Sequence, residues 1–366
     1  MADCTAVARI IVVGTSAALA ACGNGSDGGP LPPTSCCTES GLNPVIGFGT
    51  LFPRAFWNDP SVRREDGQYR MWLTAGDPLS SPIRVAVYEA TSPDGLAWTI
   101  DPVEQFSPTG KPGDFDELRT ETPEVVLHAG TYHLYYSGCT QDDTNGCENG
   151  VYAIGHATST DGEHWVRDPA NPVVTAQTDP GKWGFFTAAE PGVIYHPGRG
   201  EFLLYHVGIR IDADGKPEAA ILLARSPDGS SFTHVTDAAG DRRAVVRLGS
   251  GYPATFGGVT QPDPVLDGAG RVHLFYTVVS DFDSFSTHSL VHAVSDDGVD
   301  FTEVERDILP AGRGDWKEAS GGRAASVLLE NGRFLLWFQG NRALSTIGQP
   351  DFRAGIGFAT SPVDCP

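Results

Sequence analysis

A pattern of alternating apolar and polar positions recurs five times along the chain, at intervals of 66 to 69 residues. In each repeat, a segment of alternating apolar and aromatic residues precedes Ala-Thr-Ser or a close variant, and four of the five repeats continue with Asp-Gly. A period of two is typical of β-strands that bury one face. Asp-Gly between two strands is typical of a tight turn, because Gly tolerates a positive φ. The Ala-Thr-Ser-like segments begin at Ala90, Ala157, Ala224, Ala293 and Ala359.

Each repeat holds enough segments for four strands. A short apolar run predicts the first strand, the aromatic segment the second, Ala-Thr-Ser the third, and the residues after Asp-Gly the fourth. The aromatic segments are residues 69–72, 132–135, 202–205, 272–275 and 334–337. Five repeats of four antiparallel strands predict an all-β fold, a five-bladed β-propeller. The alternative is an elongated β-solenoid, which would need shorter repeats.

The two ends of the folded region are predicted to meet. The fifth repeat stops after its third strand, so its fourth strand must come from elsewhere in the chain. We expect an N-terminal strand within residues 45–51 to supply it and close the ring, with residues 41–366 as the propeller domain. Cys365 would then lie near Cys36 or Cys37 and could form a disulfide with either, leaving one thiol over.

The N-terminal segment is predicted to be a targeting signal rather than part of the fold. After Arg9, the apolar stretch 10–21 is too short to span a bilayer as a helix. It ends in Leu-Ala-Ala before Cys22, which resembles the lipobox of bacterial lipoproteins. The resemblance implies a signal peptide at 1–21, lipidation of Cys22, a flexible tether at 22–40 and a lipid-anchored protein of the cell envelope, at the outer membrane or cell surface. An ordinary secretory signal with an incidental cysteine is the alternative.

Charge and cysteine content narrow the function classes. The formal net charge is −21, and the acidic residues are distributed along the chain, so nucleic acid and anionic membrane surfaces are excluded as partners. We expect a monomer that binds a neutral or cationic ligand. Cys139 and Cys147 bracket a polar loop and predict a local disulfide, and no cysteine pair has the spacing of a zinc site. We therefore expect neither a metal nor another cofactor.

Acidic residues stand where the first strand of several repeats begins. In a propeller these strands line a central channel, so their side chains converge on one site. Counting back from the aromatic segments aligns Asp59 with Glu190, and with Asp263 if the fourth repeat has one extra turn residue. Converging carboxylates are what glycoside cleavage needs, because one acts as base or nucleophile while another donates a proton. Each carboxylate could instead cap backbone amides at the entrance of its strand.

Motifs around these positions resemble those of known glycosidases. The sequence Trp-Asn-Asp-Pro at 57–60 resembles the first-blade motif of the invertase and levanase family. Asp-Pro-Ser-Val at 59–62 and Thr-Pro-Glu-Val at 122–125 resemble motifs of glycoside hydrolase family 43 arabinanases and xylosidases, and residues 322–327 resemble their fifth-blade segment. The resemblance extends over roughly residues 48–366. It implies a glycoside hydrolase acting on a poly- or oligosaccharide, with a furanoside such as arabinan or fructan favoured.

The resemblance also implies roles for individual residues. Asp59 would be the base or nucleophile, and Glu190 would take the place of an Asp that stabilises the transition state. The general acid would be Asp263 or Glu190 itself, since the family's Glu in the fourth blade has no counterpart here. Arg323 replaces a His that helps to hold a channel cation, which argues against a metal. The candidate sugar contacts are Trp57, Arg119, Glu121 and Arg323.

A second hypothesis follows from the same departures. Without the family's acid and fifth-blade His, the protein could be a surface lipoprotein that binds carbohydrate without cleaving it. A protein-interaction propeller is a third possibility. Release of reducing sugar by the purified domain separates the first hypothesis from the second.

Overall fold

The computed structural model describes residues 36–77, 84–139, 151–185, 187–249, 252, 256–280, 288–310, 316–317, 321–341 and 353–364. Within these residues the fold is all-β, as expected, and no helix could cross a membrane. The predicted signal peptide, the lipidation site Cys22, Cys147 and Cys365 lie outside the described residues. The lipid anchor, the disulfide between Cys139 and Cys147 and the disulfide of Cys365 with Cys36 or Cys37 therefore stay predictions.

The strands follow the five sequence repeats, which we number as units 1 to 5. Unit 1 contains β2 (Phe56–Glu65), β3 (Gln68–Gly76), β4 (Val85–Ser92) and β5 (Thr99–Ile100). Unit 2 contains β6 (Arg119–His128), β7 (Thr131–Cys139), β8 (Tyr152–Ser159) and β9 (Val166–Arg167). Unit 3 contains β10 (Ala188–His196), β11 (Glu201–Ile211), β12 (Pro217–Ser226), β13 (Thr233–His234) and β14 (Ala244–Val246).

Unit 4 contains β15 (Phe256–Leu266), β16 (Val272–Ser280), β17 (His288–Ser295) and β18 (Thr302–Glu305). Unit 5 contains β19 (Arg323–Glu330), β20 (Arg333–Asn341) and β21 (Ala354–Pro362), and β1 (Thr38–Glu39) pairs with β21 at its edge. Successive strands within a unit pair antiparallel. Short parallel pairings join β4 to β6 and β12 to β15, so the strands form three hydrogen-bonded sheets.

The N-terminal strand differs from the predicted one. The fourth strand of unit 5 is β1, which lies within the predicted tether 22–40, so the folded part begins before residue 41. The predicted segment 45–51 contributes only an isolated bridge, between Ile46 and Ile356. Residues 41–44 contain a turn and the cis peptide bond Asn43–Pro44, and these separate the bridge from β1.

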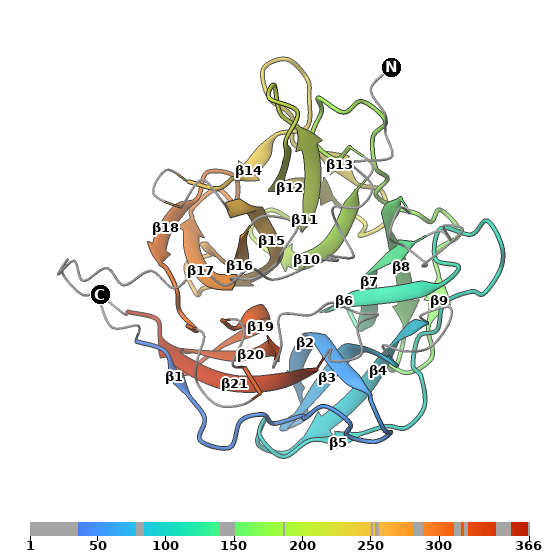
Figure 1. Ribbon diagram of the computed structural model, residues 1–366, viewed down its shortest axis with the longest axis vertical. Helices are drawn as coiled ribbons and strands as arrows, with labels where there is room; N and C mark the ends of the chain where they lie inside the picture. Colours follow the sequence, from blue (N-terminus) through green and yellow to red (C-terminus); the bar gives the residue numbers. More distant parts are fainter. Residues whose placement is uncertain are drawn as a thin grey trace, which may run out of the picture.

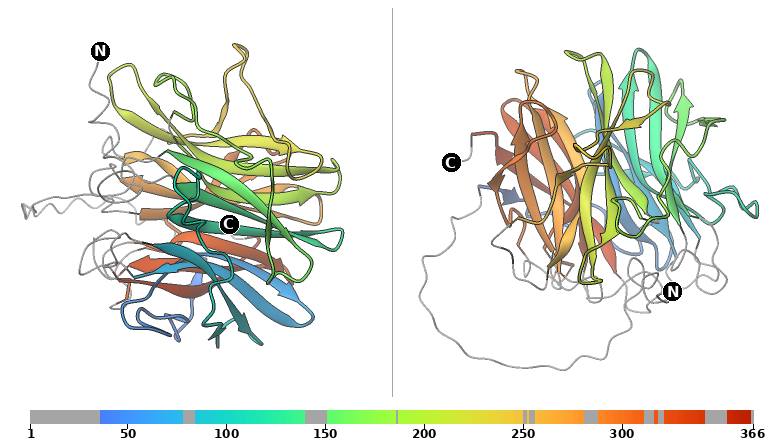
Figure 2. Two further views of the ribbon diagram at one scale, coloured as in Figure 1. Left: turned by 90° about the vertical axis from the view of Figure 1, so that its right-hand side faces the viewer. Right: turned by 90° about the horizontal axis from the view of Figure 1, so that it is seen from above.

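The first strand of each unit lies innermost, and these strands contact one another in order. β6 contacts β2 and β10, β15 contacts β10 and β19, and β19 contacts β2 (Figure 1). Viewed from the side, the long strands of neighbouring units lie next to one another (Figure 2). The apolar core fills the spaces between units. For example, one cluster joins Trp337 and Ile356 of unit 5 to Trp57 and Met71 of unit 1.

Hydrogen bonds from the aromatic strands also join the units. The ring N–H or hydroxyl of an aromatic residue on the second strand donates to the carbonyl of the Gly in a neighbouring Asp-Gly turn. The pairs are Trp72 with Gly162, Tyr135 with Gly229, Tyr205 with Gly298, and Trp337 with Gly95, at 2.7 to 3.1 Å. Unit 4 has Phe275 at this position, which carries no donor, and the neighbouring unit 5 has no Asp-Gly turn. The repeat therefore supplies both the aromatic donor and the glycine acceptor of this hydrogen bond.

Candidate active site

Each innermost strand contains a β-bulge at an equivalent position. In β2 the register shifts between Asn58 and Ser61, which leaves Asp59 and Pro60 without direct partners on β3. The first residue of every bulge has a positive φ, and we call these five the bulge residues: Asp59, Thr122, Glu190, Gln261 and Ala324, with φ of 47°, 52°, 55°, 52° and 46°. A non-glycine residue pays about 1–2 kcal/mol for this conformation, and such strain gathers at functional sites.

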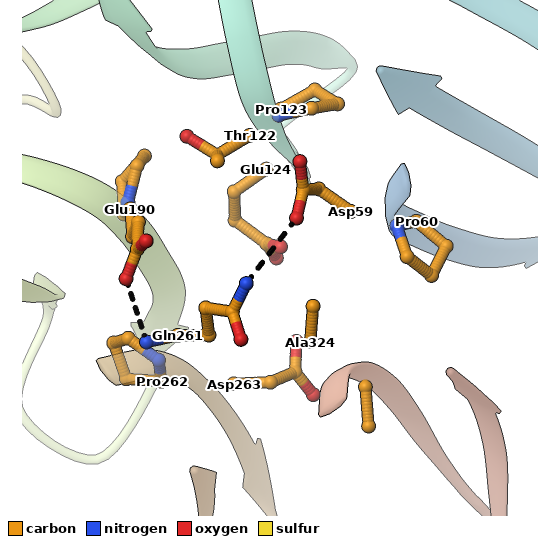
Figure 3. Close-up of a pocket in the computed structure, with 12 residues that line it drawn as sticks. Asp59, Pro60, Thr122, Pro123, Glu124, Glu190, Gln261, Pro262, Asp263 and Ala324 are labelled. Atoms are coloured by element: carbon orange, nitrogen blue, oxygen red, sulfur yellow. Dashed lines mark hydrogen bonds between the residues drawn. The ribbon is translucent and has the colours of Figure 1, made fainter. Parts of the chain in front are cut away.

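The bulges line a pocket where the innermost strands meet (Figure 3). Its volume is about 330 Å³, part of which is open to solvent. The lining residues are Asp59, Pro60, Thr122, Pro123, Glu124, Glu190, Pro191, Gln261, Pro262, Asp263, Ala324 and Ala325. Four of these side chains are carboxylates, and none is basic. Pro suits the second bulge position in four units, because it has no N–H that would need a ladder partner.

Asp59 interacts with the polar side chains of Thr74, Gln261 and Arg323. Its side chain hydrogen-bonds to Thr74 of β3, and Gln261 Nε2 donates to Asp59 Oδ1 at 3.5 Å. Burial raises the pKa of Asp59 to about 7, although the charge of Arg323 acts against this rise. Near neutral pH the carboxylate therefore exchanges readily between its ionised and protonated forms, as a catalytic acid or base must.

Glu190 lines the same pocket. Its Oε2 accepts a hydrogen bond from the backbone N–H of Gln261 at 2.9 Å. Burial raises the pKa of Glu190 to about 7; the bond from Gln261 opposes this rise and the charge of Asp59 adds to it. The structure therefore brings Asp59 and Glu190 together as an interacting pair, as the sequence predicts. Arg323 lies close enough to interact with both charges, and burial lowers its own pKa.

A second acidic pair lies two residues further along the strands. Glu124 and Asp263 occupy equivalent positions and line the pocket. Asp263 Oδ2 accepts a hydrogen bond from the backbone N–H of Val327 at 2.8 Å. Burial raises the pKa of both carboxyls well above the ordinary range, and repulsion from Asp263 raises that of Glu124 further. Both therefore favour the protonated form, and Asp263 is built into a contact between units 4 and 5.

Asp263 does not align with Asp59. A register shift in β15 lies between Thr260 and Asp263, and Gln261 has the positive φ, so Gln261 is the bulge residue of unit 4. The turn of unit 4 is longer than that of unit 1, residues 267–271 against 66–67, and this length places Gln261 rather than Asp263 level with Asp59. The Pro following Gln261 was the available signal, because Asp59, Thr122 and Glu190 also precede a Pro. Sequence reasoning also missed Glu124 and Gln261 as site residues, because it did not use the Pro after the bulge residue to align the units.

None of the four expected sugar contacts lines the pocket, which corrects the assignment of Trp57, Arg119, Glu121 and Arg323. Trp57 is fully buried and packs edge-on against Tyr88, with ring centroids 5.7 Å apart. Arg119 is 1 % exposed, and its Nη1 lies 4.0 Å from Glu121 Oε1. Glu121 is also buried, with Oε1 accepting a hydrogen bond from Tyr152 at 2.7 Å, but its charge acts on both Asp59 and Glu190. Among the described residues, no three His, Cys, Asp or Glu side chains are grouped to hold a metal ion.

Solved structures with the same arrangement of strands are carbohydrate-active enzymes. The β-1,2-mannobiose phosphorylase from Listeria innocua, in complex with β-1,2-mannobiose, matches with a TM-score of 0.65 and 14% identity, covering 89% of this chain and 97% of that chain. A glycosyl hydrolase from Bacteroides ovatus matches with a TM-score of 0.61 and 14% identity, covering 87% of this chain and 91% of that one. This chain shares the fold of these two proteins.

The Bombyx mori GH32 β-fructofuranosidase also matches, with a TM-score of 0.58 and 15% identity. The match covers 87% of this chain and 61% of the fructofuranosidase chain. No protein-family model and no curated protein sequence matches the chain. At these identities the similarity extends to the fold, and the chemistry must be argued from the pocket.

Proposed function

We propose that this protein is a glycoside hydrolase in which Asp59 and Glu190 form the acid–base pair. One observation carries the proposal: two half-buried carboxylates, each with a pKa of about 7, are bridged by Gln261 in the central pocket. Glycosidic cleavage needs an ionised carboxylate and a protonated carboxyl acting on one bond. A pair whose members repel each other meets this need, because ionisation of one keeps the proton on the other.

The surroundings favour Asp59 as the ionised member. Asp59 receives hydrogen bonds from Thr74 and Gln261 and interacts with the charge of Arg323, all of which stabilise a negative charge. Glu190 receives one backbone hydrogen bond, and the charge of Asp59 opposes its ionisation more than the charge of Arg323 favours it. Asp59 is therefore the base or nucleophile, and Glu190 is the general acid. Asp263, the other candidate for the acid, is held by the backbone of Val327.

The charge of the pocket favours water over phosphate as the attacking group. Phosphorolysis requires a dianion to enter the site beside the ionised carboxylate of Asp59, and the lining offers no basic residue to neutralise it. Arg323 does not line the pocket, and its charge already interacts with Asp59 and Glu190. The chain therefore differs in proposed reaction from the phosphorylase whose fold it shares.

The wider proposal includes the fold and the location of the enzyme. The five units would be the five blades of a propeller closed by β1, which is supported by the contacts of β19 with β2 and by the shared cluster around Trp337. The favoured substrates are furanosides such as arabinan or fructan. A lipid anchor at Cys22 would hold the enzyme at the cell surface, and Cys22→Ala should release it from the membrane fraction.

The non-catalytic alternative rests on Gln261. An amide at the bulge of unit 4 cannot donate a proton to a leaving group, so this blade lacks the acid expected of the resembling families. The pocket would then bind carbohydrate without cleaving it. Glu190 in unit 3 must supply the proton if the hydrolase proposal is right.

A glycan panel tests the proposal. Purified protein is incubated with arabinan, fructan and β-mannosides, with and without inorganic phosphate, and the products are resolved by chromatography. We expect reducing sugar from at least one glycan without phosphate, and at least a hundredfold loss in Asp59→Asn. The exposed Asp94→Asn variant is the matched control and should keep full activity. Binding without release by the unaltered protein would favour the non-catalytic alternative.

A further inference from the structure

We propose that Gln261 is a positioning residue that assigns the two catalytic roles, with its side-chain amide donating to Asp59 Oδ1 and its backbone N–H donating to Glu190 Oε2. The inference rests on the proposed function and extends it. Gln261 is the element that touches both carboxylates at once, one through the side chain and one through the backbone (Figure 3). Its positive φ of 52° allows both contacts from one residue.

The contact to Glu190 arises from a substitution on a neighbouring strand. At three other junctions between units, the N–H of the bulge residue donates to a hydroxyl on the second strand of the preceding unit. These bonds are Thr122 N to Thr74 Oγ1, Glu190 N to Ser137 Oγ and Ala324 N to Thr277 Oγ1, at 2.8 to 3.2 Å.

Unit 3 has Val207 at the corresponding position of β11, and Val offers no acceptor. A buried N–H without a partner costs about 1–3 kcal/mol. Glu190 Oε2 takes the place of the missing hydroxyl for Gln261. The backbone therefore fixes one oxygen of Glu190. Since that oxygen accepts from an N–H, it is the carbonyl oxygen of the protonated acid, and the proton resides on Oε1.

The side chain of Gln261 acts on Asp59, the other carboxylate of the pair. Its Nε2 can only donate, so it favours the ionised form of Asp59 over the protonated one. Its Oε1 is buried and finds no hydrogen-bond partner among the described residues. A glutamate here would remove the donor and place a third charge beside the pair. The amide is thus suited to keeping Asp59 as base and Glu190 as acid.

The first test replaces Gln261 by Glu and records the pH dependence of kcat/KM. Loss of the donor and addition of a charge should raise the pKa of Asp59, so the acidic limb of the profile should move up by about one pH unit. Gln105→Glu, which adds the same charge near the surface, should leave the profile in place. A lower rate with an unmoved profile would show that Gln261 is only structural and would overturn the inference.

The second test leaves Gln261 and Glu190 intact. Val207→Thr restores a hydroxyl acceptor for the N–H of Gln261 and so releases Glu190 Oε2. The pKa of Glu190 should then rise, because the lost bond favours its ionised form, and the basic limb should move up by about half a pH unit or more. Val279→Thr makes the same change in the same apolar cluster and should not shift the limb. An unmoved limb in Val207→Thr would contradict the inference.

A measurement without substrate separates the two proposals. Titration of the carboxyl carbons of Asp59 and Glu190 by NMR should show the same shifts in both variants. If no glycan is cleaved but the titrations shift as stated, the hydrolase proposal fails and the role of Gln261 stands. If glycans are cleaved and neither the titrations nor the profiles shift, the role of Gln261 fails alone.

Discussion

Glu190→Gln is expected to stabilise the protein in a pH-dependent way while removing its activity. Burial and the charge of Asp59 raise the pKa of Glu190 from an ordinary 4.5 to about 7. The folded state therefore holds this proton more tightly than the unfolded chain does. Below about pH 4.5 the side chain is protonated in both states and costs nothing. Between about pH 4.5 and pH 7 the unfolded chain releases this proton while the folded state keeps it, so stability falls over this range. The loss levels off above about pH 7, where the folded state also ionises.

The size of the effect follows from the same values. At 1.36 kcal/mol per pH unit, the cost of ionising Glu190 reaches about 3 kcal/mol at alkaline pH. Gln keeps an oxygen that can accept from the N–H of Gln261, so the variant avoids the cost without losing that bond. We expect no gain at pH 4.5 and a gain that grows to about 3 kcal/mol at pH 9. For a domain of this size that corresponds to a melting temperature higher by about 4 °C.

Thermal unfolding of both proteins between pH 4.5 and pH 9 measures this difference. Glu163→Gln serves as the control, because Glu163 is exposed and its replacement should change stability equally little at every pH. A gain that does not vary with pH, or a loss at pH 9, would refute the reasoning. It would mean that Glu190 is stabilised in its charged form, as in a structural ion pair.

Two further predictions concern the contacts between and within the units. Tyr205→Phe removes the hydroxyl that donates to Gly298 O at 2.8 Å and should lower the free energy of unfolding in urea by about 1 kcal/mol; an unchanged midpoint would contradict the role of this bond. Burial lowers the pKa of His292 to about 3, so the folded state binds fewer protons than the unfolded chain below about pH 6.5 and loses stability as the pH falls. His292→Gln should therefore lose less melting temperature between pH 7 and pH 5 than the unaltered protein, and an equal loss would assign the acid sensitivity to other groups.

Much of the fold could be predicted from the repeat, because each Asp-Gly turn and each aromatic strand recurs at a nearly fixed interval. The pairing of strands within a unit is local and follows from this period. The partner of β21 could not be read in the same way, since β1 has two residues and contributes almost no pattern of its own. The prediction therefore placed the strand that pairs with β21 several residues too late.

The site was predicted in part. Asp59 and Glu190 were found by counting back from the aromatic segments and by the resemblance of their motifs to known glycosidases. In unit 4 both Gln261 and Asp263 precede a Pro, and the count from the aromatic segment selected Asp263 instead of Gln261. The role of Val207 lies beyond such reasoning, because its effect on Glu190 depends on strands that meet only in the folded protein.

A comparison of leaving groups in Glu190→Gln tests the central claim most directly. A dinitrophenyl glycoside of the identified sugar needs no protonation to depart, whereas the natural glycan does. If Glu190 is the acid, the variant should cleave the activated glycoside within about tenfold of the unaltered rate and the glycan at least about a hundredfold more slowly. Equal losses on both substrates, or no loss on the glycan, would contradict the assignment of Asp59 and Glu190 as the catalytic pair.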